Sequence, residues 1–286
     1  IIGDETGIGK GRILSGISRW AWKAGKKVLF FTEREHLMSE FWKDLHDTDN
    51  IKLLKNPIAF HSKSKIFNPD GSEAEKSGNG LRIFARYLYE EKYINHKNFS
   101  VNTLGGVVGV EILDETADFI KIDMGTASFN SLDIPVCGAI REVINEDLVI
   151  DNKSFKISCV SIGNPHCVVF CDEVSKQIAI QYGEKIEQHK LFPGKINVQF
   201  LKVLDKNNIQ IEIWERGAGY TLSSGSSSCA AASVAHKLEL VDNSINVHMP
   251  GGIIKIEIQD NKSILMSGVV TKICYGTGFC VIKDDM

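Results

Sequence analysis

The sequence SGSSSCAAASVA spans residues 224–235 and follows WERGAGYTL at residues 214–222. A run of glycine and serine that leads into alanines, which have the highest helix propensity, predicts a loop followed directly by a helix. The free backbone N–H groups at such a helix start can bind an anion, such as a substrate carboxylate. A plain capped helix would have the same local sequence, so this stretch alone leaves both interpretations open.

A second stretch, SGNGLRIFARYL at residues 77–88, has the same layout of Ser-Gly, a small polar turn and a helix. Its apolar residues recur at helical spacing: Leu81, Phe84, Ala85 and Leu88. Two loop-to-helix units in different halves of one chain predict two similar lobes with a site between them. Such a site can hold one group on each face of a bound molecule.

Composition limits the classes of protein to consider. The chain has 286 residues, of which 43% are hydrophobic and 24% charged, which is typical of a globular protein in water. A net charge of −3 argues against a general nucleic-acid surface. The seven cysteines form no Cys-x-x-Cys pair, which favours reduced thiols and a cytoplasmic location. No apolar stretch is long enough to span a membrane and no signal peptide is recognisable, so we expect no membrane partner. No cluster of His, Cys, Asp and Glu has metal-ligand spacing, so we expect no metal.

The first 50 residues have a character of their own. The sequence GDETGIGKGR at residues 3–12 is typical of a phosphate-binding loop, with Gly9 and Lys10 as the candidate nucleotide-binding residues. It resembles the first motor motif of the strawberry-notch-like superfamily-2 helicases. Gly11 stands where most such loops have the Ser or Thr that binds Mg²⁺, and the preceding strand is reduced to Ile1 and Ile2. We therefore expect residues 1–55 to form a small βα segment without a complete nucleotide site.

From Ile66 onward the pattern is rich in short strands separated by turn residues, which predicts a mixed α/β (α+β) fold. The expected strands are residues 106–113, 119–124, 148–150, 155–161, 168–170, 196–200, 209–214, 245–249, 253–258 and 264–270, with a polar helix at 176–189. No low-complexity linker divides residues 55–286.

Specific motifs run through this region. They are FNPDGSEAE at 67–75, SGNG at 77–80, DMG at 123–125, GNPH at 163–166, NV at 197–198, WERGAG at 214–219 and SG at 224–225. With them, residues 66–282 resemble the diaminopimelate epimerase family, which inverts an amino-acid α-carbon without a cofactor. The resemblance implies two similar lobes, each a curved mixed sheet around a central helix. The expected boundaries are 56–129 with 270–286 for one lobe and 130–269 for the other.

The resemblance also implies the site residues. The two catalytic cysteines of the family fall at Ser77 and Ser224. The implied substrate-binding residues are Asn68, Gly78, Asn79, Asn164, Asn197, Glu215, Arg216, Gly225 and Ser226. Among them, Glu215 is expected to hold the substrate ammonium group, and Arg216 is suited to bidentate binding of the distal carboxylate. His166 is expected to be a structural histidine beside its turn.

The serine pair is a chemical departure from the family. Inverting a stereocentre without a cofactor needs one group to remove the α-proton and another to deliver a proton to the opposite face. A serine hydroxyl is a far weaker acid than a thiol and needs a neighbouring base to act. The leading hypothesis is therefore an epimerase that converts LL- to meso-diaminopimelate, for lysine and cell-wall precursor synthesis, with activity weakened by the serines. Its partner is a small-molecule amino acid, and the sequence allows a homodimer.

Two other interpretations remain open at this point. One is a non-catalytic amino-acid-binding homologue, which would not incorporate solvent deuterium at the substrate α-carbon. The other is a P-loop NTPase with an appended epimerase-like domain, which would lose nucleotide binding on Lys10→Ala.

Overall fold

The computed structural model describes residues 77–103 and 105–271, and those up to Val270 belong to one structural unit. The phosphate-loop segment with Gly9 and Lys10 lies outside the described residues, and so does Asn68. The predictions made for these positions therefore stay predictions.

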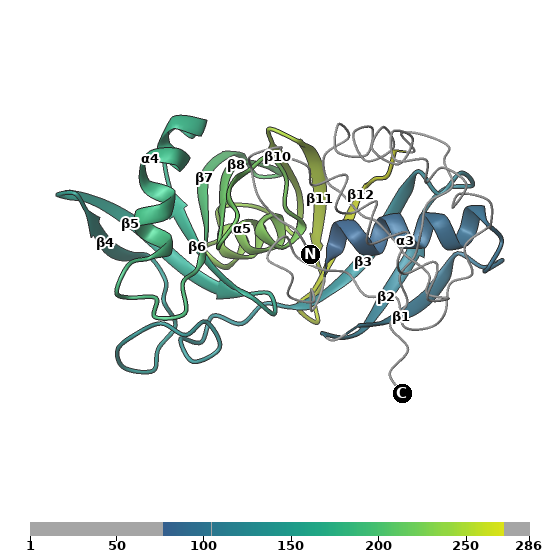
Figure 1. Ribbon diagram of the computed structural model, residues 1–286, viewed down its shortest axis with the longest axis horizontal. Coiled ribbons are helices and arrows are strands. Elements are labelled where there is room, and N and C mark those ends of the chain that lie inside the picture. The colour runs from purple at the N-terminus through teal and green to yellow at the C-terminus, as the bar shows by residue number, and fades with distance from the viewer. Residues whose placement is uncertain (1–76, 104, 272–286) are drawn as a thin grey trace, which may run out of the picture. The chain divides into compact units, whose positions relative to one another are not determined.

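The described strands join in one hydrogen-bonded sheet of twelve strands in the order β1-β2-β3-β12-β11-β10-β8-β7-β6-β5-β4, with β9 paired to β8 off this path (Figure 1). Their bounds are β1 Asn98–Thr103, β2 Gly106–Ile112, β3 Phe119–Thr126, β4 Glu146–Ile150, β5 Lys153–Ser161, β6 Pro165–Phe170, β7 Asn197–Asp205, β8 Asn208–Glu215, β9 Gly219–Thr221, β10 Ser244–Met249, β11 Gly252–Ile258 and β12 Ser263–Val269. Most neighbours are antiparallel, whereas β6 with β7 and β8 with β10 are parallel.

This mixed sheet confirms the predicted fold class, and every strand expected between residues 106 and 270 is present. Two short strands were not predicted. β1 alternates Phe99 and Val101 with Asn and Ser side chains at the edge of the sheet, and β9 is only three residues long. The proposed division into lobes near residue 130 stays a prediction. Hydrogen bonding between strands continues from β3 through β12 into β11.

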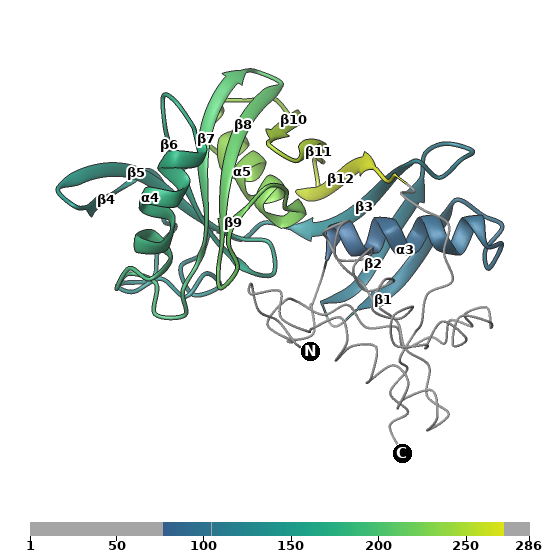
Figure 2. The ribbon, with the colours of Figure 1, turned by 45° about the horizontal axis from the view of Figure 1, so that its top comes forward.

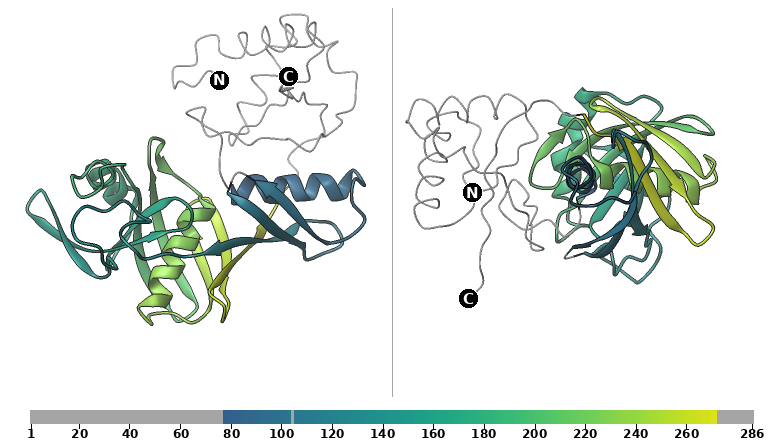
Figure 3. Two further views of the ribbon diagram at one scale, coloured as in Figure 1. Left: turned by 90° about the horizontal axis from the view of Figure 1, so that it is seen from below. Right: turned by 90° about the vertical axis from the view of Figure 1, so that its right-hand side faces the viewer.

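Helix α5 (Gly225–Lys237) is the most deeply buried helix of the described chain. It contacts β5, β6, β7, β8, β10, β11 and β12, and the views in Figures 2 and 3 show strands around it. Every residue from Ser227 to Ala235 is buried. Small side chains such as Ala230, Ala231 and Ala232 let strands approach the helix axis from several directions, which a helix with large side chains would prevent.

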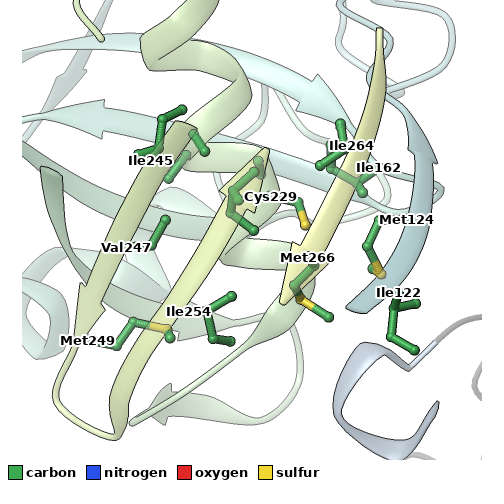
Figure 4. Close-up of a cluster of buried hydrophobic side chains, with 14 of the residues drawn as sticks. Ile122, Met124, Ile162, Cys229, Ile245, Val247, Met249, Ile254, Ile264 and Met266 are labelled. Carbon is green, nitrogen blue, oxygen red and sulfur yellow. The ribbon is translucent and has the colours of Figure 1, made fainter. Parts of the chain in front are cut away.

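The other two described helices each cover part of the sheet. Helix α3 (Gly78–Glu90) contacts β2, β3 and α5, and buries Leu81, Arg82 and Ala85. Helix α4 (Lys176–Glu187) contacts β4, β7, β8 and β9. Figure 4 shows part of the core between α5 and the strands, including Met266 on β12, Met124 on β3 and Cys229 on α5.

Candidate active site

The two serines singled out in the sequence are the N-cap residues of α3 and α5. Ser77 has extended backbone angles, and its Oγ accepts a hydrogen bond of 3.2 Å from the backbone N–H of Gly80. Ser224 has the same conformation, and its Oγ accepts from the backbone N–H of Ser227 at 3.4 Å. Both helices therefore begin where the repeated Ser-Gly pattern predicts, and each serine satisfies one N–H group of its first turn.

The two helix starts meet at Met266 of β12, which is fully buried. A Cβ atom on Gly78 would overlap Met266 Cε, and one on Gly225 would lie 2.9 Å from Met266 Sδ and 3.7 Å from Asn79 Oδ1. The thioether of Met266 fills the space next to both glycines, so an added Cβ at either position would have to displace the end of that side chain. Figure 4 shows Met266 on β12 within the core. The two loops thus come together although they are far apart in the sequence.

The electrostatics of this place favour negative charge. Neither α3 nor α5 has an acidic residue in its first turn. The positive ends of two helix dipoles are therefore brought together without a carboxylate in either first turn. An arrangement of this kind suits an anionic group, such as a substrate carboxylate or a deprotonated side chain.

A second group of predicted site residues gathers at one end of β6, β7 and β8. Since β6 and β7 are parallel and β8 is antiparallel to β7, the starts of the first two and the end of the third share one edge. Asn197, the first residue of β7, donates from Nδ2 to the Pro165 carbonyl at 2.9 Å and accepts at Oδ1 from the Arg216 backbone N–H at 3.0 Å. One amide thus ties the Asn164–Pro165 turn to the Glu215–Arg216 turn.

Glu187, at the end of α4, fixes the same turn from the other side. Its buried carboxylate accepts hydrogen bonds from Trp214 Nε1 at 2.8 Å and from the Gly217 backbone N–H at 3.1 Å. Glu215 accepts from Thr221 Oγ1 at 3.3 Å. Arg216 is exposed and donates from its guanidinium to the Gly194 carbonyl at 3.2 Å. The turn that carries Glu215 and Arg216 is therefore held by side chains on both flanks.

His166 is fully buried in β6, which agrees with the structural role expected for it. Its Nε2 lies 2.9 Å from Asn164 Oδ1. Burial, with a smaller contribution from the Arg216 cation, lowers the pKa of His166 to about 3, so the ring is neutral near neutral pH. A neutral ring with its proton on Nε2 donates to Asn164 and fixes that amide in one orientation.

Gln199 connects β7 to the first turn of α5. It is fully buried, and its Nε2 donates to Ser227 Oγ at 3.0 Å. The same strand carries Asn197 two residues earlier, so β7 links the asparagine cluster to the helix start after Ser224. Ser226 lies in that first turn and is half-buried.

The structure therefore gathers the predicted residues that it describes into two groups joined by β7. Sequence reasoning missed Arg82, Glu187 and Gln199. Arg82 stands inside the helical pattern of α3, Glu187 ends a polar helix, and Gln199 interrupts an apolar strand. Only Gln199 gave a local signal, because an amide between Val198 and Phe200 in a buried strand needs a polar partner.

Within residues 77–103 and 105–271, no group of three or more His, Cys, Asp and Glu side chains is arranged to hold a metal ion. None of the helices in this part is both long and apolar enough to cross a membrane.

Comparison with known proteins gives consistent results. The sequence model of the family described as diaminopimelate epimerase matches residues 43–130 and 158–273. The chain is 54% identical over 212 residues to diaminopimelate epimerase 2 of Nostoc sp. strain PCC 7120, covering 74% of each protein. It is 38% identical over 238 residues to diaminopimelate epimerase of Halothermothrix orenii, covering 82% of this chain and 83% of that one.

A similar fold occurs in the crystal structure of a hydroxyproline epimerase from Agrobacterium vitis. The TM-score is 0.54 at 13% identity, and the match covers 75% of this chain and 68% of that chain.

Proposed function

We propose that this chain, which belongs to the diaminopimelate epimerase family, is a cofactor-independent epimerase that acts on diaminopimelate. The observation that carries the proposal is the meeting of two serine-capped helix starts at Met266. Epimerisation needs two acid/base groups on opposite faces of one carbon, and two converging loops are suited to supply one group each. Family membership favours this function over that of a nucleotide hydrolase.

In the proposed reaction, the side chain at 77 or 224 takes the α-proton and the other returns a proton to the opposite face. The substrate carboxylate binds at the helix starts with Gly78, Asn79, Gly225 and Ser226. At the other group, Glu215 holds the ammonium end and Arg216 the distal carboxylate, with Asn68, Asn164 and Asn197 completing the site. Asn197 uses one Nδ2–H and one lone pair within the protein, which leaves its second Nδ2–H for substrate.

The serines make the proton transfer slow. A helix dipole stabilises nearby negative charge by about 0.3–1 kcal/mol, less than the ~1.36 kcal/mol that corresponds to one pKa unit. Such a shift leaves a hydroxyl far from being a base near neutral pH. We therefore expect the double variant Ser77→Cys with Ser224→Cys to exchange the α-proton of diaminopimelate with solvent deuterium at least tenfold faster than the parent.

The exchange is measured by mass spectrometry or NMR, with each single variant as a control. Because both acid/base groups act on one carbon, the singles should gain less than the double variant. A parent as fast as the double variant would contradict this account of the chemistry. A double variant that binds diaminopimelate and never exchanges its proton would favour the amino-acid-binding homologue instead.

For residues 1–55 we retain the proposal of a phosphate-loop-like segment that contributes no complete nucleotide site. Its second part overlaps the family match, which begins at residue 43. The homodimer, the cytoplasmic location and the equivalence of the two serines with catalytic cysteines are likewise proposals.

A further inference from the structure

Arg82 is a buried cation behind the first serine-capped loop. It lies in the second turn of α3 and is 7% exposed. Among the described residues no carboxylate forms an ion pair with it. By contrast, Arg86 pairs with Glu90 at 2.8 Å and Arg141 pairs with Glu146 at 2.7 Å. A buried charge is costly unless something nearby compensates it, so the position of Arg82 needs an explanation.

The contacts of Arg82 place it at the junction of the two helix starts. One terminal nitrogen donates to Asn79 Oδ1 at 2.9 Å, and the other lies 3.6 Å from Met266 Sδ. Met266 in turn fills the space between Gly78 and Gly225. The guanidinium therefore contacts Asn79 directly and, through the Met266 thioether, reaches the glycines that follow Ser77 and Ser224.

The far side of the guanidinium is closed as well. A Cβ atom on Gly268 of β12 would lie 3.3 Å from the Arg82 Cζ, so the backbone of β12 packs against the cation. Among the residues that the structure describes, the buried Nε of Arg82 has no hydrogen-bond partner. The titratable side chain that faces it from α5 is Cys229, while Arg86 on α3 lies one turn further on and is engaged with Glu90 and Asp118.

We propose that Arg82 is a positioning residue that stabilises negative charge at the two serine-capped helix starts and holds Asn79 in its orientation. The inference rests on the proposed function, in which that charge develops on the side chain at 77 or 224. Burial lowers the pKa of Arg82 to about 10, so the side chain keeps its charge near neutral pH. The positive charge of Arg82 and the positive ends of the two helix dipoles then both stabilise negative charge at the helix starts.

The hydrogen bond to Asn79 adds a geometric effect. Because the guanidinium occupies the Oδ1 side of the amide, and no described residue accepts from Nδ2, the two Nδ2–H groups of Asn79 can serve as donors for a bound anion. A lysine at 82 would keep the charge but cannot reproduce the planar fork that reaches Asn79 and Met266 together.

The test measures a thiol pKa and needs no turnover. In the full-length Ser77→Cys chain, the alkylation rate of the introduced thiol by iodoacetamide is followed against pH. The modified peptide is resolved by mass spectrometry because the chain has seven other cysteines. Adding Arg82→Met should raise that thiol pKa by about one unit and slow alkylation below the pKa roughly tenfold. Arg82→Lys should keep the pKa close to that of Ser77→Cys alone.

Arg86→Met in the same background is the matched control, because it removes a cation from the same helix that is already paired. The proposal is overturned if Arg82→Met leaves the thiol pKa unchanged, or if Arg86→Met raises it equally. Should the Arg82→Met chain not fold, as checked by thermal unfolding, Arg82→Gln removes the charge and keeps a donor for Asn79. A thiol shift in the Ser77→Cys chain, together with a Ser77→Cys/Ser224→Cys double variant that binds diaminopimelate and never exchanges its α-proton, would leave this inference standing and overturn the proposed function.

Discussion

At the scale of single residues, the site depends on polar side chains that are bonded on more than one side. Asn197 joins two turns through one amide, and Glu187 joins α4 to the Trp214–Gly217 segment through one carboxylate. Both are buried, where an unpaired polar group costs about 1–3 kcal/mol. Replacing Asn197 or Glu187 therefore removes a connection between two segments and leaves the bonded groups of both segments unpaired.

Glu187→Gln tests this at the carboxylate. One oxygen becomes an amide NH₂ that faces an N–H donor, so one of the two hydrogen bonds is lost. We expect the free energy of unfolding to fall by about 1–3 kcal/mol, measured by urea denaturation. We also expect the KM for diaminopimelate to rise more than kcat falls, because in the proposed site the turn bearing Glu215 and Arg216 holds the substrate. Glu184→Gln, on the exposed face of α4, is the control and should change neither quantity.

At the scale of secondary structure elements, α4 approaches the sheet closely because one of its residues has no side chain. A Cβ atom on Gly183 would lie 2.5 Å from Cγ and 2.7 Å from Cβ of Trp214. These atoms belong to the rigid base of the tryptophan and cannot move aside as the end of a flexible chain can. The same tryptophan donates to Glu187, so the fit between α4 and β8 also sets the position of the following turn.

Gly183→Ala should therefore be destabilising although alanine is the better helix former. The propensity gain is about 1 kcal/mol, and overpacking costs about 1–3 kcal/mol or more for atoms that cannot shift. We expect a net loss of roughly 1–2 kcal/mol in unfolding free energy. Gly194→Ala is the control, because a Cβ there meets nothing within 4 Å. A Gly183→Ala chain more stable than the parent would show that Trp214 can move.

The elements also show what the sequence can and cannot predict. Both helix starts were predicted, since a Ser-Gly cap before a helical pattern is a local signal. The partners of those starts were not. Met266 looks like an ordinary apolar residue of a strand, and Arg82 follows Leu81 in a helix whose exposed face includes Ile83. The side of α3 that is covered is set by a contact between Arg82 and Met266, which lie 184 positions apart in the sequence.

At the scale of the whole molecule, one buried histidine couples folding to pH. The pKa of His166 is lowered to about 3 in the folded chain, from an ordinary value of 6.5. Below pH 6.5, His166 therefore binds a proton in the unfolded chain and stays neutral in the folded chain until the pH approaches 3. Stability from this residue is complete above pH 6.5, declines as the pH falls and stops declining below about 3.

The slope of this decline is at most about 1.4 kcal/mol per pH unit, the value for one proton. We expect His166→Gln to make the curve of unfolding free energy against pH flatter by up to that amount between pH 6 and 4, whatever its effect on absolute stability. His96→Gln, at an exposed position, is the control and should keep the slope of the parent. Urea denaturation at several pH values gives the three curves. Equal slopes for the parent and His166→Gln would mean that His166 is protonated in the folded chain as readily as in the unfolded chain. Asn164 would then not be held by a neutral imidazole.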